Sequence, residues 1–270
     1  MHNQDSLTAA RYEYQSNSPF PHTVIEDFFD KLLVEEASTA FPLAGSDEWI
    51  HYSHFNEEKH GLTKLEAMPE IFREIIGYLN SESFVRSLEQ LTGIPKLISD
   101  PTLQGGGLHQ TKSGGHLNIH ADFTVHPLKR NWRRRVNLLL YLNPNWSESY
   151  EGHLELWSKD MKKCERRISP ALNTCVIFNT DSDSFHGVPT PLNCPEDRTR
   201  NSIALYYYTD EPRKTRLRAT NYQARPGEGF KGVLIWLDKM AIAIYTRLKR
   251  RLGFSDETIS RLLAKLRRRG

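Results

Sequence analysis

Residues 114–123 read GGHLNIHADF, and this stretch decides the fold class. Two glycines mark a turn, and residues 117–123 after them have the length of a β-strand. Four more strand-length segments follow between Pro, Asn, Gly and Asp turns, with no long helical pattern between them, at residues 136–142, 153–157, 173–179 and 201–208. Such spacing is typical of a sheet that closes or wraps on itself. The sequence therefore predicts a β core of jelly-roll type.

Helical patterns flank this β core on both sides. Apolar residues recur at helical spacing in residues 24–36, 65–79 and 81–91, and Ser81 and Gly93 are suitable cap residues for the last of these. The helical period returns in residues 233–252 and 255–268. The predicted fold class is therefore mainly β with flanking helices (α+β).

These patterns predict three parts of the chain. A polar N-terminal arm occupies residues 1–22, a main domain occupies residues 23–225, and a basic amphipathic helical tail occupies residues 226–270. Within the main domain we expect a helical part at residues 23–96 and the β core at residues 97–212.

The composition limits the class of protein. A chain of 270 residues that is 38% hydrophobic can bury a substantial core, which excludes disordered and fibrous proteins. No run of 18 apolar residues and no apolar N-terminal segment occurs, so we expect a cytoplasmic location. The three cysteines form neither a C-x-x-C pair nor an even set, and we interpret them as ordinary thiols.

Positive charge is concentrated at the end of the chain. Residues 247–270 contain nine Lys or Arg against Asp256 and Glu257, which makes +7, and the formal net charge of +3 then leaves −4 for residues 1–246. A net-acidic body argues against a broad nucleic-acid surface, although the basic cluster at residues 129–135 can guide an anionic substrate. Residues 233–268 form a solvated helical face, pair in a dimer, or contact the inner face of a membrane peripherally. The oligomeric state stays open.

Chemically reactive side chains lie in and after the strand at residues 117–123. His120 and Asp122 are two positions apart in a strand, so their side chains project from the same face. His186 follows a later apolar strand, and Arg200 opens the next one. Two histidines and a carboxylate on one face of an octahedral ion form the facial triad of non-haem Fe(II) oxygenases. Arg200 and Ser202 share a strand face and can together hold a carboxylate.

Residues 105–209 resemble the catalytic domain of the prolyl-4-hydroxylase-like Fe(II)/2-oxoglutarate dioxygenases. The resemblance rests on the GGHLNIHADF stretch, on RVNLLLYLN at residues 135–143, on EGHLELW at residues 151–157, and on RNSIALYYY at residues 200–208 after His186. The family fold is a double-stranded β-helix with helices packed outside, which agrees with the strand pattern.

This resemblance implies roles for individual residues. His120, Asp122 and His186 would bind the iron and form the catalytic centre, and Arg200, with Ser202, would pair with the distal carboxylate of 2-oxoglutarate. The interval from His186 to Arg200 is longer than in the family, so Arg198 is a rival for that role. Where many relatives carry a tyrosine before the HxD strand, this chain has His109 or Gln110, and we take His109 as the substitute.

The implied reaction uses Fe(II) as cofactor, 2-oxoglutarate and O2 as co-substrates, and ascorbate as a candidate reductant. It would release succinate and CO2 and hydroxylate a peptidyl, amino-acid, natural-product or sugar substrate. Asp122 favours hydroxylation, because related halogenases lack this carboxylate. Two alternatives remain: a non-catalytic cupin-like metal-binding module, which would not need Arg200, and a nucleic-acid demethylating oxygenase, which would need a basic groove. The second His-x-carboxylate pair, His153 and Glu155, is interpreted as part of a core strand.

Overall fold

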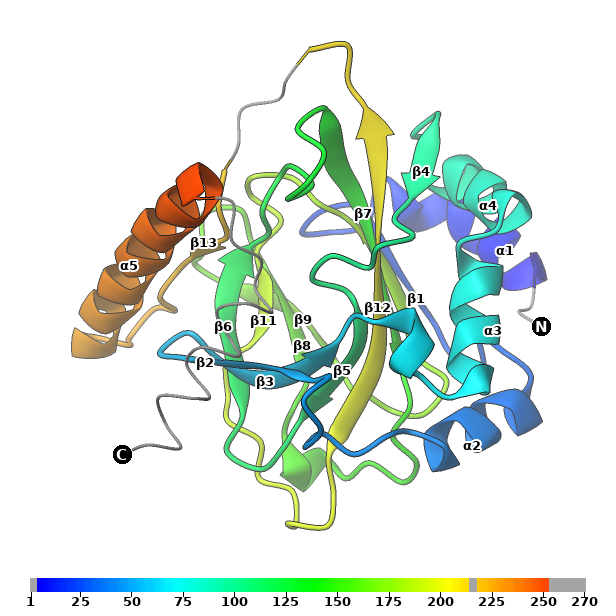
Figure 1. Cartoon of the computed structure of the whole chain (residues 1–270), viewed down its shortest axis with the longest axis horizontal. Helices are drawn as coiled ribbons and strands as arrows, with labels where there is room; N and C mark the ends of the chain where they lie inside the picture. The colour runs from blue at the N-terminus through cyan, green and yellow to red at the C-terminus, as the bar shows by residue number, and fades with distance from the viewer. Residues whose placement is uncertain (1–3, 214–217, 253–270) are drawn as a thin grey trace.

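The computed structural model describes residues 4–213 and 218–252, in which thirteen strands join a curled, mostly antiparallel sheet (Figure 1). The strands are β1 (His22–Ile25), β2 (Ile50–His54), β3 (Glu57–Leu62), β4 (Leu97–Ser99), β5 (Gly107–Thr111), β6 (His116–Ala121), β7 (Trp132–Tyr141), β8 (Leu154–Trp157), β9 (Cys164–Ile168), β10 (Cys175–Asn179), β11 (His186–Val188), β12 (Arg200–Asp210) and β13 (Asn221–Tyr222). Their order is β1-β10-β7-β12-β5-β3-β6-β11-β8-β9, with β13 beside β6, β2 beside β3 and β4 beside β12.

All five strands expected from the sequence are present, as β6, β7, β8, β10 and β12. Most neighbours in the sheet order are distant in sequence, as in a wrapped jelly roll; β8 with β9 and β2 with β3 are the consecutive pairs. The predicted fold class, mainly β with flanking helices around a jelly-roll core, is confirmed.

The helices lie on two opposite sides of the sheet (Figure 1). They are α1 (Gln4–Tyr14), α2 (Lys31–Thr39), α3 (Glu70–Leu79), α4 (Glu82–Thr92) and α5 (Phe230–Leu252), with short 3-10 turns at Leu65–Ala67 and Glu148–Tyr150. The caps expected for α4 are confirmed, because Ser81 accepts a hydrogen bond from Phe84 N and Gly93 ends the helix with a φ of 67°.

Two N-terminal segments differ from the expectation. The segment expected as a polar arm forms α1, which buries Leu7 and Tyr14 and packs against α4. The helix expected over residues 24–36 begins only at Lys31, behind an Asp30 cap. Its first residues instead form β1, where Val24 pairs with Val176 of β10. Val and Ile are compatible with the apolar face of a helix and with a half-buried strand. Here the segment forms a strand because it pairs with β10 at the edge of the sheet.

The main hydrophobic core lies between the sheet and helices α2, α3 and α4. Alternation along β7 turns Leu138 and Leu140 toward these helices, and it turns Asn137 and Tyr141 to the other face. That inner face is enclosed by the rest of the curled sheet. Polar side chains on it are therefore buried inside the β core.

Helix α5 lies beside β13 and β6, across the sheet from α1 to α4 (Figure 1). It contacts the β2–β3 turn, where Asp238 accepts hydrogen bonds from Asn56, and Ile235 is buried. The helix predicted at residues 255–268 lies outside the described residues. Over the described residues, no helix has the length and apolar content needed to cross a membrane.

Candidate active site

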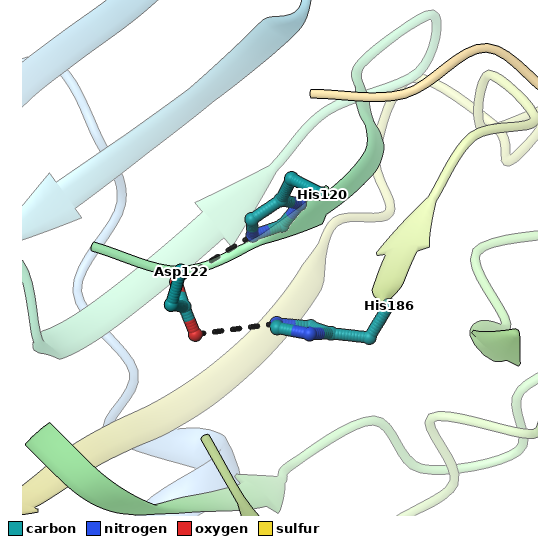
Figure 2. Close-up of side chains that lie close together, drawn as sticks. All are labelled: His120, Asp122 and His186. Carbon is teal, nitrogen blue, oxygen red and sulfur yellow. Dashed lines mark ion pairs between the residues drawn. The ribbon is translucent and has the colours of Figure 1, made fainter. Parts of the chain in front are cut away.

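Two histidines face each other across neighbouring strands inside the β core. His186 of β11 is the register partner of His120 of β6, and Asp122 follows the end of β6. Asp122 Oδ1 lies 3.6 Å from His120 Nε2, and Asp122 Oδ2 lies 3.4 Å from His186 Nε2. One ligand atom from each residue lies within 4.8 Å of the other two. Figure 2 shows that the three side chains point toward one centre.

Backbone carbonyls orient both imidazoles. His120 Nδ1 lies 2.9 Å from the carbonyl of Asn118, and His186 Nδ1 lies 2.9 Å from the carbonyl of Ser184. A carbonyl can only accept, so both Nδ1 atoms carry a proton, which leaves Nε2 as the atom of each ring that can offer a lone pair on the side of Asp122. This tautomer is the one that a metal ligand needs.

Burial keeps the imidazole of His186 neutral. Burial and the neighbouring His120 together lower the pKa of His186 to about 4, although Asp122 opposes the shift. Two imidazoles and one carboxylate on one side of a centre suit Fe(II) or a similar divalent ion. The donor set therefore fits the metal that the sequence implies.

Arg134 and Asn137 both contact the carboxylate of Asp122. Arg134 Nη2 lies 3.0 Å from Asp122 Oδ2, and Asn137 Nδ2 donates to the same oxygen at 2.7 Å. Burial alone would raise the pKa of Asp122, but Arg134, His186 and His120 keep it well below the usual value. The carboxylate is therefore ionised and fixed in orientation.

A β-bulge explains why Arg134 points inward. Tyr207 of β12 pairs with Val136, but Tyr208 pairs with Arg134, so Arg135 is an extra residue in β7. Val136 packs in the outer core, and regular alternation would have placed Arg134 on that same face. With the bulge, the guanidinium lies 3.4 Å from the Tyr206 ring centroid and is buried. Among the Lys and Arg residues at 129–135, Arg134 is the buried one.

Arg200 lies buried on the inner face at the start of β12. Its Nε donates to the carbonyl of Gly152 at 2.7 Å, and its guanidinium lies 4.8 Å from the centroid of the Tyr141 ring. Arg198 instead donates to the carbonyl of Pro144 on the exposed side. Of the two rival arginines, only Arg200 is inside the β core.

Ser202, His109 and Tyr141 form a row beside Arg200. Ser202 of β12 is the register partner of His109 on β5 and of Tyr141 on β7, and all three side chains are buried. Among the described residues, neither Tyr141 Oη nor His109 Nε2 has a hydrogen-bond partner. A buried polar atom without a partner needs an explanation, and two of them facing one arginine are consistent with a bound ligand. A carboxylate beside Arg200 would satisfy both atoms, so the pocket fits 2-oxoglutarate.

Sequence reasoning missed Tyr141, Arg134 and Asn137. Tyr141 and Asn137 lie in the RVNLLLYLN stretch, whose alternation places both on one face, and this signal could have found them. No sequence signal marks the bulge that turns Arg134 inward. The interpretation of His153 and Glu155 as structural agrees with their contacts, because His153 Nε2 lies 2.7 Å from Glu148 and Glu155 accepts from Trp157 Nε1 at 2.8 Å.

Comparison with known proteins agrees with this geometry. Residues 106–208 match the sequence profile described as the 2OG-Fe(II) oxygenase superfamily. Prolyl 3-hydroxylase OGFOD1 of Mus musculus is 33% identical over 79 residues, which are 28% of this chain and 14% of the mouse protein. The expected resemblance to the Fe(II)- and 2-oxoglutarate-dependent oxygenases is confirmed over these residues.

Solved structures of similar fold include two prolyl hydroxylases. A prolyl-4-hydroxylase from Pseudomonas putida has a TM-score of 0.55 at 16% identity, covering 75% of this chain and 98% of that one. A prolyl hydroxylase from Trichoplax adhaerens, solved with a hypoxia inducible factor peptide fragment, has a TM-score of 0.53 at 19% identity, covering 76% of this chain and 90% of that one. These likenesses support the jelly-roll fold.

Proposed function

We propose that this chain, whose residues 106–208 belong to the 2OG-Fe(II) oxygenase superfamily, is an Fe(II)- and 2-oxoglutarate-dependent dioxygenase that hydroxylates an unactivated C–H bond. The observation that carries the proposal is the convergence of two imidazole Nε2 atoms and one carboxylate within 4.8 Å. Bound Fe(II) would supply the activation of O2 that is coupled to conversion of 2-oxoglutarate to succinate and CO2.

His120, Asp122 and His186 are the proposed metal ligands and catalytic centre. The hydrogen bonds from Nδ1 of His120 and His186 to backbone carbonyls keep both imidazole rings from rotating. Contacts with Arg134 and Asn137 keep the Asp122 carboxylate from rotating. Ligands on one side of an octahedral ion leave the other positions open for co-substrates.

Arg200 is the proposed partner of the distal carboxylate of 2-oxoglutarate. Its Nη atoms are available because Nε is the atom that donates to Gly152. Ser202 and Tyr141 each offer a hydroxyl to the same carboxylate, and His109 offers its unpartnered Nε2. Burial, with Lys59 nearby, keeps the pKa of His109 well below the usual value, so this ring is neutral and can donate. A non-catalytic metal-binding module would not need these polar side chains around Arg200.

The substrate is proposed to be a peptidyl residue, an amino acid, a natural product or a sugar. The named relatives include prolyl hydroxylases, which makes peptidyl proline the first acceptor to assay. A nucleic-acid substrate is not favoured, because residues 1–246 are net negative.

Turnover of 2-oxoglutarate tests the proposal. Protein reconstituted with Fe(II) and given ascorbate and O2 should form succinate, at a slow uncoupled rate without acceptor and faster with the right one. His186→Ala should abolish succinate formation, whereas His51→Ala, on the exposed β2–β3 hairpin, should leave it unchanged. No succinate from folded, metal-loaded protein would refute the dioxygenase proposal.

A cytoplasmic location with peripheral membrane contact through residues 233–268 remains a prediction. Support comes from α5, whose exposed apolar side chains recur at helical spacing: Val233, Trp236, Leu237, Met240 and Ile244. Sedimentation with anionic liposomes tests it. Trp236→Glu should reduce binding severalfold, and equal binding would contradict membrane contact through this face.

A further inference from the structure

A cavity opens beside Asp122 on the side of the sheet that carries α5. Its volume is about 280 Å³, close to the smallest small-molecule sites in proteins. It is lined on the β6 side by Asp122 and Thr124, and on the opposite side by the segment at residues 218–221 and by Lys239 and Met240 of α5. The cavity thus joins the proposed metal centre to the C-terminal part of the described chain.

Backbone pairing fixes the segment that forms one wall of this cavity. Thr124 N donates to the carbonyl of Arg218, and Arg218 N donates to the Thr124 hydroxyl. Two residues of β13 then pair with β6, Asn221 opposite Ala121 and Tyr222 opposite His120. The wall is therefore tied to the sheet at both of its ends, at Thr124 and through β13.

Polar contacts fix α5, which forms the other wall. Asp238 Oδ2 lies 2.9 Å from His54 Nδ1 and accepts from Asn56 Nδ2 at 2.6 Å, and Asn56 Nδ2 also lies 3.2 Å from the carbonyl of Ile235. The neighbouring Lys239 is thereby held at the cavity, where it is half-buried.

The cavity is lined by two positively charged residues, although residues 1–246 have a negative net charge. Lys239 and Arg218 both line it, and neither side chain has an ion pair or hydrogen bond with a described residue. The one acidic lining residue, Asp122, is already paired with Arg134 and would be further compensated by a bound metal. Burial lowers the pKa of Lys239, so an anion beside it would stabilise its charged form.

We propose that this cavity is the substrate pocket and that it takes a small molecule through an anionic group, a carboxylate or a phosphate, held by Lys239 and Arg218. The inference rests on the proposed dioxygenase function and narrows its substrate class. Arg supplies a planar fork and Lys a point charge, a combination that suits tetrahedral or planar oxyanions. Ser182, Thr124 and Asn221 add hydrogen-bonding groups around the same space.

The test uses the full chain loaded with Mn(II) in place of Fe(II) and saturated with 2-oxoglutarate, so that the Arg200 pocket is occupied. Inorganic phosphate is titrated and its ³¹P relaxation is measured, because the paramagnetic ion accelerates relaxation of a nucleus bound nearby. A second arm titrates ¹³C-labelled acetate in the same way. We expect saturable enhancement, and the anion that binds more tightly identifies the substrate's anionic group.

Variants identify the residues that hold the anion. Lys239→Gln and Arg218→Gln should each weaken anion binding about tenfold, the effect of losing one charge-assisted hydrogen bond. Lys231→Gln, which removes a charge from the same helix outside the cavity, should leave binding unchanged. Each variant must retain Mn(II) and 2-oxoglutarate binding.

The outcomes separate this inference from the proposed function. If Mn(II) and 2-oxoglutarate bind but neither anion gives saturable enhancement, or if both Gln variants bind anions as the wild type does, the anionic pocket is refuted and the dioxygenase proposal stands. If Mn(II) and 2-oxoglutarate do not bind to the folded wild type, the dioxygenase proposal itself fails.

Discussion

Arg134 lies directly behind Asp122, with its Nη2 3.0 Å from Asp122 Oδ2. The arginine is buried, and it reaches the carboxylate because a bulge at Arg135 turns it inward. A buried cation in contact with a proposed metal ligand acts on the orientation and the charge of that ligand.

Replacing Arg134 by Met should therefore weaken metal binding. Met fills much of the same volume but cannot hold Asp122, and outer partners of metal ligands typically contribute ten- to hundredfold in affinity. We expect the Kd for Mn(II) to rise by about that factor, measured by electron paramagnetic resonance. Arg135→Met is the matched control, because Arg135 is half-exposed and contacts Thr209 and Glu211 instead. Unchanged Mn(II) affinity in folded Arg134→Met would contradict the positioning role.

Arg200 and Arg198 should differ sharply in their effect on 2-oxoglutarate. Arg200→Ala removes the buried guanidinium beside Tyr141, and we expect 2-oxoglutarate to bind about a hundredfold more weakly. Arg198→Ala removes an exposed contact with the carbonyl of Pro144, and we expect less than a twofold change. Equilibrium binding to Mn(II)-loaded protein measures both. Equal effects of the two variants would overturn the assignment of Arg200.

Gly187 should tolerate no side chain, because β11 and β6 approach closely there. A Cβ on Gly187 would lie 2.7 Å from the carbonyl oxygen of Leu117 and 2.9 Å from that of Asn118. Gly187→Ala should lower the free energy of unfolding by about 1–3 kcal/mol and, because it displaces His186, weaken Mn(II) binding. Gly77→Ala in α3, where nothing lies within 4 Å of the added Cβ, should be neutral or stabilising. A Gly187→Ala protein as stable and as metal-competent as the wild type would contradict this register.

The local pattern of the proposed metal site could be predicted from sequence, whereas the contact between Arg134 and Asp122 could not. His120 and Asp122 are two residues apart on one strand, and spacing alone reveals a shared face. The inward turn of Arg134 depends on a bulge that forms only when β12 pairs with β7. Strands β3 and β5 are glycine-containing and polar, so they carry little hydrophobic signal, and their burial comes from neighbours distant in sequence.

Asp100 should make stability depend on pH in acid. Burial alone would raise the pKa of Asp100, but hydrogen bonds from His126, Thr102 and Gln104 lower it to about 2. A carboxyl group whose pKa is lower in the folded than in the unfolded protein stabilises the fold at a pH above its unfolded-state pKa, which is near 4. This contribution is lost as the pH falls from about 4 to about 2. It amounts to about 2 kcal/mol.

Asp100→Asn should therefore lower the free energy of unfolding by about 2 kcal/mol at neutral pH and by little near pH 2. Urea unfolding of the wild type and the variant across this range measures the difference. Asp160→Asn, on an exposed turn, is the control and should change stability little. A wild-type-to-Asn difference that stays constant from neutral pH to pH 2 would contradict the hydrogen-bonded carboxylate at Asp100.

We propose above all that His120, Asp122 and His186 hold one iron to which 2-oxoglutarate binds. The most direct measurement is an anaerobic titration of the Fe(II)-loaded chain with 2-oxoglutarate, followed by visible absorption. We expect the weak charge-transfer band of an Fe(II)–2-oxoglutarate chelate in the wild type and its loss in His186→Ala. A folded, Fe(II)-loaded wild type that gives no such band, or an equal band in His186→Ala, would contradict it.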